Sequence, residues 1–334
     1  MIGGLPVGEG SPLRIQGMLK SPLDEPEKIL EEGRRLVEAG AEIIRAAVPG
    51  EDSAAVYGAL SDLGVPLVAD CHFSPGIAAS ALKAGFDKVR VNPGNTPEKG
   101  VLETAEAAAR RSAALRLGFN SGSCGAHGSE ELASLALEWD DKLRKRGFEN
   151  FLVSMKSPSV TATVDANRFF SMRSDTPLHI GVTATGPPRE GIIKTSAALG
   201  ALLVDGVGDT IRVSLTDESV EEVRTAVILR NAVFGYGDAL EVISCPGCSR
   251  SRIDVSSWLD TLISELAPED REKPLSIAVM GCEVNGPGEA SHCDIGICGT
   301  RNGALIIRKG KALKTAESGE KEMIRMLIRE FRKL

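Results

Sequence analysis

Residues 66–91 read PLVADCHFSPGIAASALKAGFDKVRV, and this stretch decides the fold class. Two short apolar runs, PLVAD (66–70) and DKVRV (87–91), flank a segment rich in alanine that is typical of a helix. A strand, a helix and a second strand at this spacing form a βαβ unit, in which the two strands lie parallel in one sheet. The stretch therefore predicts an α/β fold.

The same unit recurs along the first part of the chain. Eight apolar runs of strand length occur at 13–16, 42–48, 66–70, 87–91, 115–120, 151–156, 178–184 and 210–215. Helix-like segments rich in Ala, Leu, Glu and Arg separate them, among them 26–39, 130–146 and 219–231. Eight alternations predict a TIM (β/α)8 barrel, with an open, doubly wound sheet as the alternative.

The pattern changes after Gly237. We expect a strand, a helix, an apolar strand, a glycine-rich loop, another strand and a closing helix, at 240–243, 254–266, 275–281, 282–299, 304–310 and 317–331. At 334 residues the chain exceeds the usual size of one domain. The sequence thus predicts a barrel domain at 1–236 and a small α/β domain at 237–334.

Charge and composition exclude several classes of protein. The net charge is −7, which argues against a general nucleic-acid or membrane-surface binder. No apolar run has the length of a membrane span, and the first residues, MIGGLPVGEGSP, lack the features of a signal peptide. We therefore expect a cytoplasmic protein.

Polar side chains gather where the predicted barrel strands end, which is where barrel enzymes place their catalytic groups. Cations occur on five different strands, and strand residues two apart share a face. Several cations converging on one mouth of an acidic protein predict an anionic substrate rich in phosphate. The cations are Arg45, Arg90, Arg116, Lys156 and Arg212, accompanied by Asn92, Asn120 and Ser214.

Asp70 and His72 lie at the end of one predicted strand, with one residue between them, so their side chains would project to the same side. A carboxylate beside an imidazole can exchange protons near neutral pH. A structural Asp–His hydrogen bond is the alternative interpretation.

The second half carries five of the seven cysteines, in residues 245–298. In a reducing compartment, clustered cysteines indicate metal ligation more than disulfides. Cys245 and Cys248 form a C-x-x-C pair, and Cys282 offers a third thiolate. This set suits an iron–sulfur cluster, a zinc ion or a redox dithiol, and the neighbouring Pro and Gly residues favour a cluster. The fourth ligand could be Glu289, Cys293 or Cys298.

Seven segments resemble the 4-hydroxy-3-methylbut-2-en-1-yl diphosphate synthase family of the methylerythritol phosphate pathway. They occur in the family's order over nearly the whole chain: PLVADCHF, KVRVNPGN, RLGFNSGS, PLHIGVT, LLVDGVGDTIRVSLT, SCPGC and VMGCEVNGPGEA. The last and the GVGDTIRVSL run are long and specific. The resemblance implies a TIM barrel followed by a [4Fe–4S] domain.

The resemblance also implies roles for the predicted site residues. Three irons of a [4Fe–4S] cluster would bind Cys245, Cys248 and Cys282, and Glu289 would hold an exchangeable fourth. The eight polar residues of the barrel mouth would bind the diphosphate of 2-C-methyl-D-erythritol 2,4-cyclodiphosphate, with Asp70 and His72 at the reacting end. Flavodoxin or ferredoxin would deliver electrons to a head-to-tail homodimer, whose reductive reaction opens the ring and removes water.

One departure falls at the expected pocket. The family's T-E-A-G is Thr183-Ala184-Thr185-Gly186 here, so an acidic group is absent at Ala184. Two alternatives therefore stay open: a paralogous iron–sulfur reductase or dehydratase acting on another phosphorylated substrate, and a non-catalytic electron-transfer protein.

Overall fold

The computed structural model describes residues 1–8, 10–50, 53–71, 74–126, 128–235, 240–316 and 318–334. The chain divides into two compact units, Met1–Phe234 and Gly235–Leu334. Each unit has its own buried apolar core.

The first unit is a parallel eight-stranded barrel, as the sequence predicts. Its strands are β1 (Arg14–Met18), β2 (Ile43–Val48), β3 (Leu67–Cys71), β4 (Lys88–Val91), β5 (Ala114–Asn120), β6 (Phe151–Lys156), β7 (His179–Ile180) and β8 (Thr210–Ile211). The sheet runs in the order β6-β5-β4-β3-β2-β1-β8-β7. A parallel bridge between Val153 and Leu178 joins β6 to β7, which closes the barrel.

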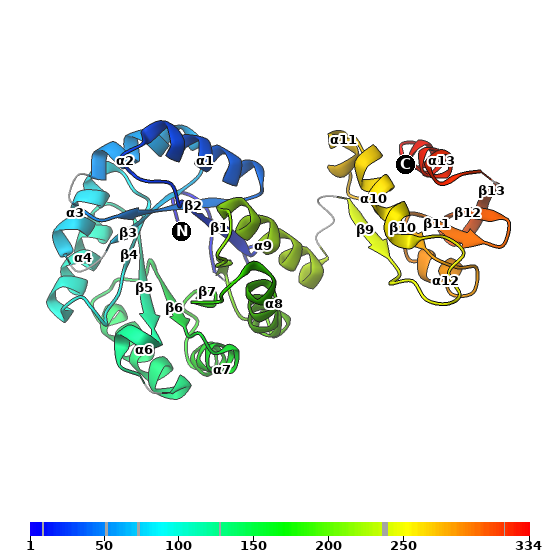
Figure 1. Ribbon diagram of the computed structural model, residues 1–334. Coiled ribbons are helices and arrows are strands. Elements are labelled where there is room, and N and C mark those ends of the chain that lie inside the picture. The colour runs from blue at the N-terminus through cyan, green and yellow to red at the C-terminus, as the bar shows by residue number, and fades with distance from the viewer. Residues whose placement is uncertain (9, 51–52, 72–73, 127, 236–239, 317) are drawn as a thin grey trace. The chain divides into compact units, whose positions relative to one another are not determined.

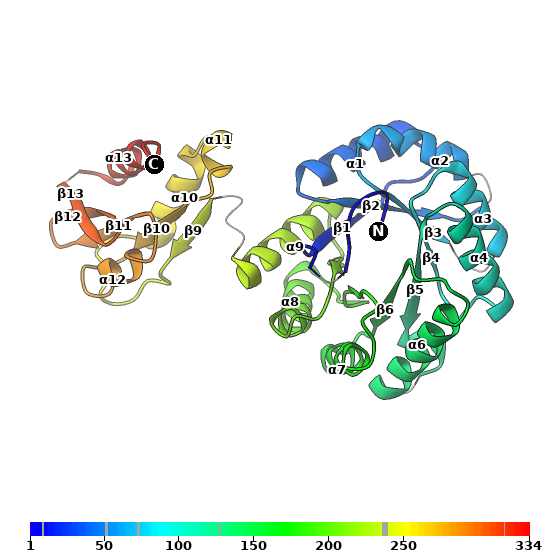
Figure 2. The same cartoon turned by 180° about the vertical axis from the view of Figure 1, so that it is seen from behind.

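Helices form a ring around these strands (Figures 1 and 2). Side-chain caps fix several starts: Ser74 accepts the Gly76 N–H before α3, and Ser159 accepts the Ala162 N–H before α7. The helices are α1 (Pro26–Glu38), α2 (Ser53–Leu60), α3 (Pro75–Ala84), α4 (Glu98–Arg110), α5 (Ser121–Cys124), α6 (Ser129–Arg144), α7 (Val160–Ser171), α8 (Pro188–Val204) and α9 (Ser219–Phe234), with a 3-10 turn, η1 (Ser61–Leu63).

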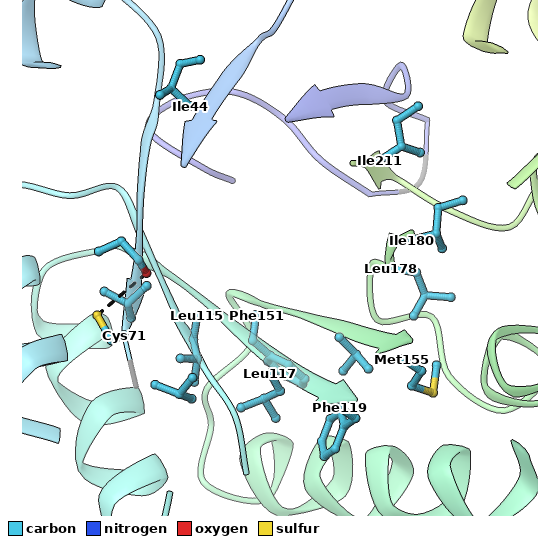
Figure 3. Close-up of a cluster of buried hydrophobic side chains, with 14 of the residues drawn as sticks. Ile44, Cys71, Leu115, Leu117, Phe119, Phe151, Met155, Leu178, Ile180 and Ile211 are labelled. Carbon is cyan, nitrogen blue, oxygen red and sulfur yellow. Dashed lines mark hydrogen bonds between the residues drawn. The ribbon is translucent and has the colours of Figure 1, made fainter. Parts of the chain in front are cut away.

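Alternation along the strands separates two environments. Outward residues such as Ile44, Leu115, Leu117 and Ile180 are buried beneath the helices and form the main core, part of which Figure 3 shows. The residues between them face the barrel interior, because side chains alternate across a strand. Among the inward residues are most of the predicted cations, so the barrel interior is charged where an ordinary core would be apolar.

An apolar plug closes the amino-terminal end of the barrel. Ile2 is fully buried against Ile43, Val68, Ala114 and Leu152, one residue from each of four strands. The plug leaves the opposite end of the barrel, where the strands finish, as the open mouth.

The second unit is a five-stranded mixed sheet in the order β13-β12-β11-β10-β9. Ile277 and Val279 pack with α10 and α13 on one face, while Ala278 and Met280 pack with α12 on the other. The elements are β9 (Glu241–Ser244), α10 (Val255–Glu265), α11 (Pro268–Arg271), β10 (Ser276–Met280), α12 (Gly286–Ala290), β11 (Ile295–Thr300), β12 (Gly303–Arg308), β13 (Lys311–Ala316) and α13 (Glu320–Phe331).

The prediction of a loop at 282–299 is wrong, because this stretch contains α12 and most of β11. Pairing decides the difference: β11 bonds in parallel to β10 and antiparallel to β12, so neighbouring strands impose extended structure on a glycine-rich sequence. Strands β7 and β8 are also shorter than the runs at 178–184 and 210–215. None of the described helices combines the length and apolar composition that a membrane crossing requires.

Candidate functional site

The five predicted cations meet at the barrel mouth. They line one pocket of about 90 Å³, together with Asn120, Ser154, Val182, Thr183 and Ser214. The register accounts for this convergence, since Asp70 lies opposite Arg90 and Arg90 lies opposite Arg116 on successive strands. No carboxylate lines this pocket among the described residues, so its walls favour an anion.

Asp70 orients two of these arginines. Arg45 Nη2 donates to Asp70 Oδ2 at 2.5 Å, and Arg90 Nη1 donates to Asp70 Oδ1 at 3.3 Å. All three side chains are largely buried, which leaves little solvent to screen the pairs. Asp70 therefore fixes where two guanidinium groups present their remaining N–H donors.

Arg212 is held from the opposite side of the barrel. Its Nη2 lies 2.9 Å from Glu222 Oε2 on α9, and Nη1 donates to Ser214. Glu222 is itself buried and accepts the Leu215 N–H at 2.8 Å, while Lys20 Nζ lies 2.8 Å from its Oε1. Ser214 and Arg212 thus act as one unit, as their spacing predicts.

Arg116 and Lys156 are both buried cations of the pocket wall. Burial lowers the pKa of Arg116 well below its usual range, and the neighbouring Arg45 and Arg90 lower it further. Burial also lowers the pKa of Lys156 strongly, and the charges of Arg116 and Arg45 lower it further. Buried like charges repel each other and lose hydration, so a bound anion would relieve both costs.

Two glycines give these cations room inside the barrel. A Cβ atom on Gly118 would lie 2.6 Å from Arg90 Nε, and one on Gly181 would lie 2.9 Å from Lys156 Nζ. Both distances are too short for any side chain, so these positions must lack one for the cations to extend across the interior.

A second, wider pocket of about 630 Å³ adjoins the first, because both share Arg90, Asn120 and Thr183. Asn92 lines it, donating to Ser123 Oγ at 2.8 Å and accepting the Gly94 N–H at 2.9 Å. Ala184 also lines it, with a φ of 53°, a left-handed conformation that is costly for a residue with a Cβ atom. The wide pocket offers amide and hydroxyl groups where the narrow one offers cations.

One predicted site residue, His72, lies outside the described residues, so the Asp70–His72 pairing stays a prediction. Sequence reasoning missed Lys88, which is fully buried on β4 two residues before Arg90. The alternation that links Arg90 to Asn92 would also have placed Lys88 on the inner face.

The carboxyl ends of β9 and β10 bring two of the predicted ligand cysteines to one edge of the second sheet. Ser244 pairs with Val279, and Cys245 follows directly, while Cys282 lies two residues beyond β10. Cys245 Sγ accepts the Gly281 N–H at 3.1 Å. Backbone N–H groups at 285, 284 and 286 lower the pKa of the Cys282 thiol. Sulfur atoms facing N–H donors suit thiolate ligands.

The other two predicted ligands are exposed. Cys248 follows in the loop after β9, where its N–H donates to Ser251 Oγ at 3.0 Å, and Glu289 lies on α12. Within the described part of the chain, no three His, Cys, Asp or Glu side chains form a group that could hold a metal ion. A [4Fe–4S] cluster binds each ligand through a different iron, so its ligands are spaced more widely than those of one ion. The donor set of three thiols and a carboxylate fits such a cluster chemically.

Cys293 and Cys298 have a different environment. Both are buried in an apolar cluster with Ala278, Met280 and Ala290. Burial, followed by charge on Cys282 and Cys245, raises the pKa of the Cys298 thiol to about 12. Burial also raises the pKa of Cys293. Because metals bind the thiolate form, this environment disfavours both residues as ligands compared with Cys282.

Fold and site together define a class: a (β/α)8-barrel protein with a cationic mouth suited to an anion, followed by a small α/β unit whose strand ends carry thiols. Family models match both parts, the GcpE TIM-barrel domain over residues 1–227 and the GcpE protein C-terminal domain over residues 241–333. The chain belongs to the GcpE family.

Its relatives include proteins named 4-hydroxy-3-methylbut-2-en-1-yl diphosphate synthase (flavodoxin). The one from Thermodesulfovibrio yellowstonii is 40% identical, over 99% of this chain and 97% of its own. The one from Aquifex aeolicus is 38% identical, over 100% of this chain and 95% of its own. A solved structure of Yersinia pestis dihydropteroate synthase covers 70% of this chain and 97% of its own, with a TM-score of 0.53 and 16% identity. That likeness concerns the barrel fold alone.

Proposed function

We propose that the chain is a 4-hydroxy-3-methylbut-2-en-1-yl diphosphate synthase. It reduces 2-C-methyl-D-erythritol 2,4-cyclodiphosphate, opening the ring and removing water, to give 4-hydroxy-3-methylbut-2-enyl diphosphate. The observation that carries the proposal is the narrow pocket, in which five cations from five strands surround a space that no carboxylate of the described residues lines. The identity to relatives with this name supports the same assignment.

The narrow pocket binds the diphosphate in this proposal. Arg45 and Arg90 present donors from fixed positions, because Asp70 holds both guanidinium groups. Arg116 and Lys156 add buried donors, and electrostatic attraction to the anion is strong there because water is largely excluded. Arg212 and Ser214 complete the cradle as a hydrogen-bonded unit.

The wider pocket takes the carbon skeleton. Asn92 and Asn120 supply amide groups, and Thr183 lies where the two pockets meet. Asp70, which pairs with Arg45 and Arg90, is placed at the reacting end with His72 in this proposal. Holding the diphosphate in the narrow pocket would fix the orientation of the carbon skeleton attached to it.

Cys245, Cys248, Cys282 and Glu289 would hold the [4Fe–4S] cluster. When bound, the cluster supplies electrons one at a time. Glu289 is the weakest of the four ligands, because iron in such clusters prefers thiolate to carboxylate. We further propose a cytoplasmic homodimer that receives electrons from flavodoxin or ferredoxin.

Anaerobic turnover tests the proposal directly. The reconstituted protein is incubated with the cyclic diphosphate and a strong one-electron reductant, and the hydroxybutenyl diphosphate is assayed. We expect product only when the cluster is loaded. A loaded cluster with no product would reject the assignment in favour of a paralogue with another phosphorylated substrate, or of an electron-transfer protein.

Two variants sharpen this experiment. Arg116→Met removes a pocket cation without leaving a large void, and it should weaken binding of the cyclic diphosphate. Ala184→Glu places a carboxylate at the position where the family motif has one. A faster reaction in Ala184→Glu would show that the missing acid limits the rate, while an unchanged rate would show that another group protonates the departing hydroxyl.

A further inference from the structure

A second polar layer lies inside the barrel beneath the narrow pocket. Lys88 precedes Arg90 by two residues on β4, so both side chains face inward and Lys88 lies one step closer to the apolar plug. Its register partner on β3, Val68, contacts that plug. Lys88 is 0% exposed.

Four side chains from four strands make up this layer, which we call the floor: Gln16 of β1, Lys88 of β4, Arg116 of β5 and His179 of β7. Each is at most 2% exposed. Their outward neighbours Ile15, Val89, Leu115 and Ile180 belong to the core beneath the helices, so the four polar groups point into the barrel.

Several polar atoms of the floor groups lack protein partners in the part of the chain that the structure describes, although His179 Nδ1 lies 2.7 Å from Thr210 Oγ1. Among the described residues, no hydrogen-bond partner is found for either polar atom of Gln16, for Lys88 Nζ, for Arg116 Nε and Nη1, or for His179 Nε2. Buried polar groups are nearly always satisfied, by protein, by ordered water or by a bound ion. Arg116 also lines the narrow pocket above, so the floor and the pocket share one side chain.

The charges facing Lys88 are positive. Burial lowers the pKa of Lys88 well below its usual range, and Arg116 and Arg45 lower it further. From β7, His179 has its own pKa lowered by burial and by Lys156, Arg116 and Lys88. Burial lowers the pKa of the Met1 amino group, and the charge of Lys88 lowers it further. The carboxylate of the neighbouring Asp87 is engaged elsewhere, where it accepts the Leu67 N–H at 2.8 Å.

We infer that Lys88 is a neutral amine in the free protein and takes up one proton from solvent when a diphosphate binds in the pocket above it. The inference rests on the proposed function, since it assigns a role to a residue under the same pocket. One N–H bond forms: the amine takes a proton from solvent and becomes an ammonium group.

The physical reason is the sign of the field at Lys88. In the free protein Arg45 and Arg116 repel an ammonium group there, and burial removes its hydration. An anion bound between those same two arginines neutralises the repulsion, so the protonated form becomes favourable. Lys88 is thus a positioning residue, which adds positive charge below the diphosphate only after the diphosphate has arrived.

Titration calorimetry in two buffers of different ionisation enthalpy measures the protons taken up on binding. The cluster-loaded protein is titrated with the cyclic diphosphate at neutral pH. We expect net uptake in the native protein, and a decrease of about one proton in Lys88→Met. Lys83→Met, which removes an exposed lysine of α3, is the matched control and should keep the native value. Native uptake near zero, or equal uptake in Lys88→Met, would overturn the inference.

A second measurement avoids dependence on the variant's folding. In native protein with ¹³C-labelled lysine, the Cε resonance of the buried residue should report a neutral amine without ligand and an ammonium group with ligand. Inorganic diphosphate serves as an additional probe. If it binds with proton uptake while the cyclic diphosphate does not bind, the proposed function fails and the role of Lys88 stands. A charged Lys88 in the free protein would refute that role alone.

Discussion

The barrel mouth differs in construction from the thiol edge, the edge of the second sheet that carries Cys245 and Cys282 at the ends of β9 and β10. In the barrel, Arg45, Asp70, Arg90 and Arg116 are buried on strands and held by register and ion pairs. In the second unit, Cys248 and Glu289 are exposed, and only Cys245 and Cys282 are fixed at strand ends by backbone N–H groups.

The difference shows what each site requires from the protein. A pocket for a diphosphate must keep like charges close together before the ligand arrives, which only a rigid, buried scaffold can do. A cluster site gains its final geometry from the cluster itself, because metal binding and local ordering are coupled. Substitutions in the barrel site are therefore expected to weaken substrate binding. Substitutions at the thiol edge are expected to weaken retention of the cofactor.

The largest expected effect separates the two regions. Cys282→Ser should lose the bound cluster and lower turnover by at least about 100-fold, since one ligand position is removed. Iron content, the visible spectrum and activity check this, while thermal unfolding of the barrel should be unchanged. Cys124→Ser, a half-buried cysteine of the barrel, is the control and should keep its iron. Full iron and activity in Cys282→Ser would contradict the ligand assignment.

Asp70→Asn tests whether ion pairs really hold the mouth. It removes the partner of two buried arginines, so we expect a loss of about 3 kcal/mol in the free energy of unfolding and about 10-fold weaker substrate binding. Denaturant unfolding and calorimetry measure the two effects. Asp175→Asn breaks an ion pair whose carboxylate is 85% exposed and should cost less than about 1 kcal/mol. Equal effects of the two variants would show that burial of the mouth does not matter.

The pH dependence of stability tests the barrel floor. Burial lowers the pKa of Lys88 in the folded protein. Below the ordinary pKa of lysine, the unfolded chain therefore binds one more proton than the folded protein, so the free energy of unfolding rises with pH. Between neutral pH and about pH 10, the native protein should gain about 1 kcal/mol per pH unit relative to Lys88→Met. Urea unfolding over this range checks the slope. Parallel curves for the two proteins would mean that Lys88 is charged in the fold.

The smallest expected effect concerns Ala184. Its φ of 53° costs about 1 kcal/mol, and glycine removes this strain while adding freedom to the unfolded chain. Ala184→Gly should therefore stabilise the protein by about 0.5 kcal/mol. Ala107→Gly, within the helix α4, should destabilise it by about 1 kcal/mol. Thermal unfolding of both variants measures the pair, and a loss in Ala184→Gly would show that the left-handed conformation is not strained.

Much of the fold could be predicted from local pattern. The eight strand runs and the helices α1, α6 and α9 lie close to their predicted positions, because apolar periodicity reports which face of an element is buried. The stretch from Cys282 to Gly299 could not be predicted, because pairing with strands on both sides, rather than local propensity, makes β11 a strand.

By itself the sequence determined the kinds of residue at the strand ends and the C-x-x-C pair, since chain spacing alone sets which side chains share a face. Only the tertiary structure decided the depth of each group. Lys88 and Arg90 share one face of one strand, yet one lies on the barrel floor and the other at the mouth. Depth follows from the register of strands around a closed barrel, which joins residues far apart in the chain. In our proposal, that depth decides which charges bind the anion and which respond to it.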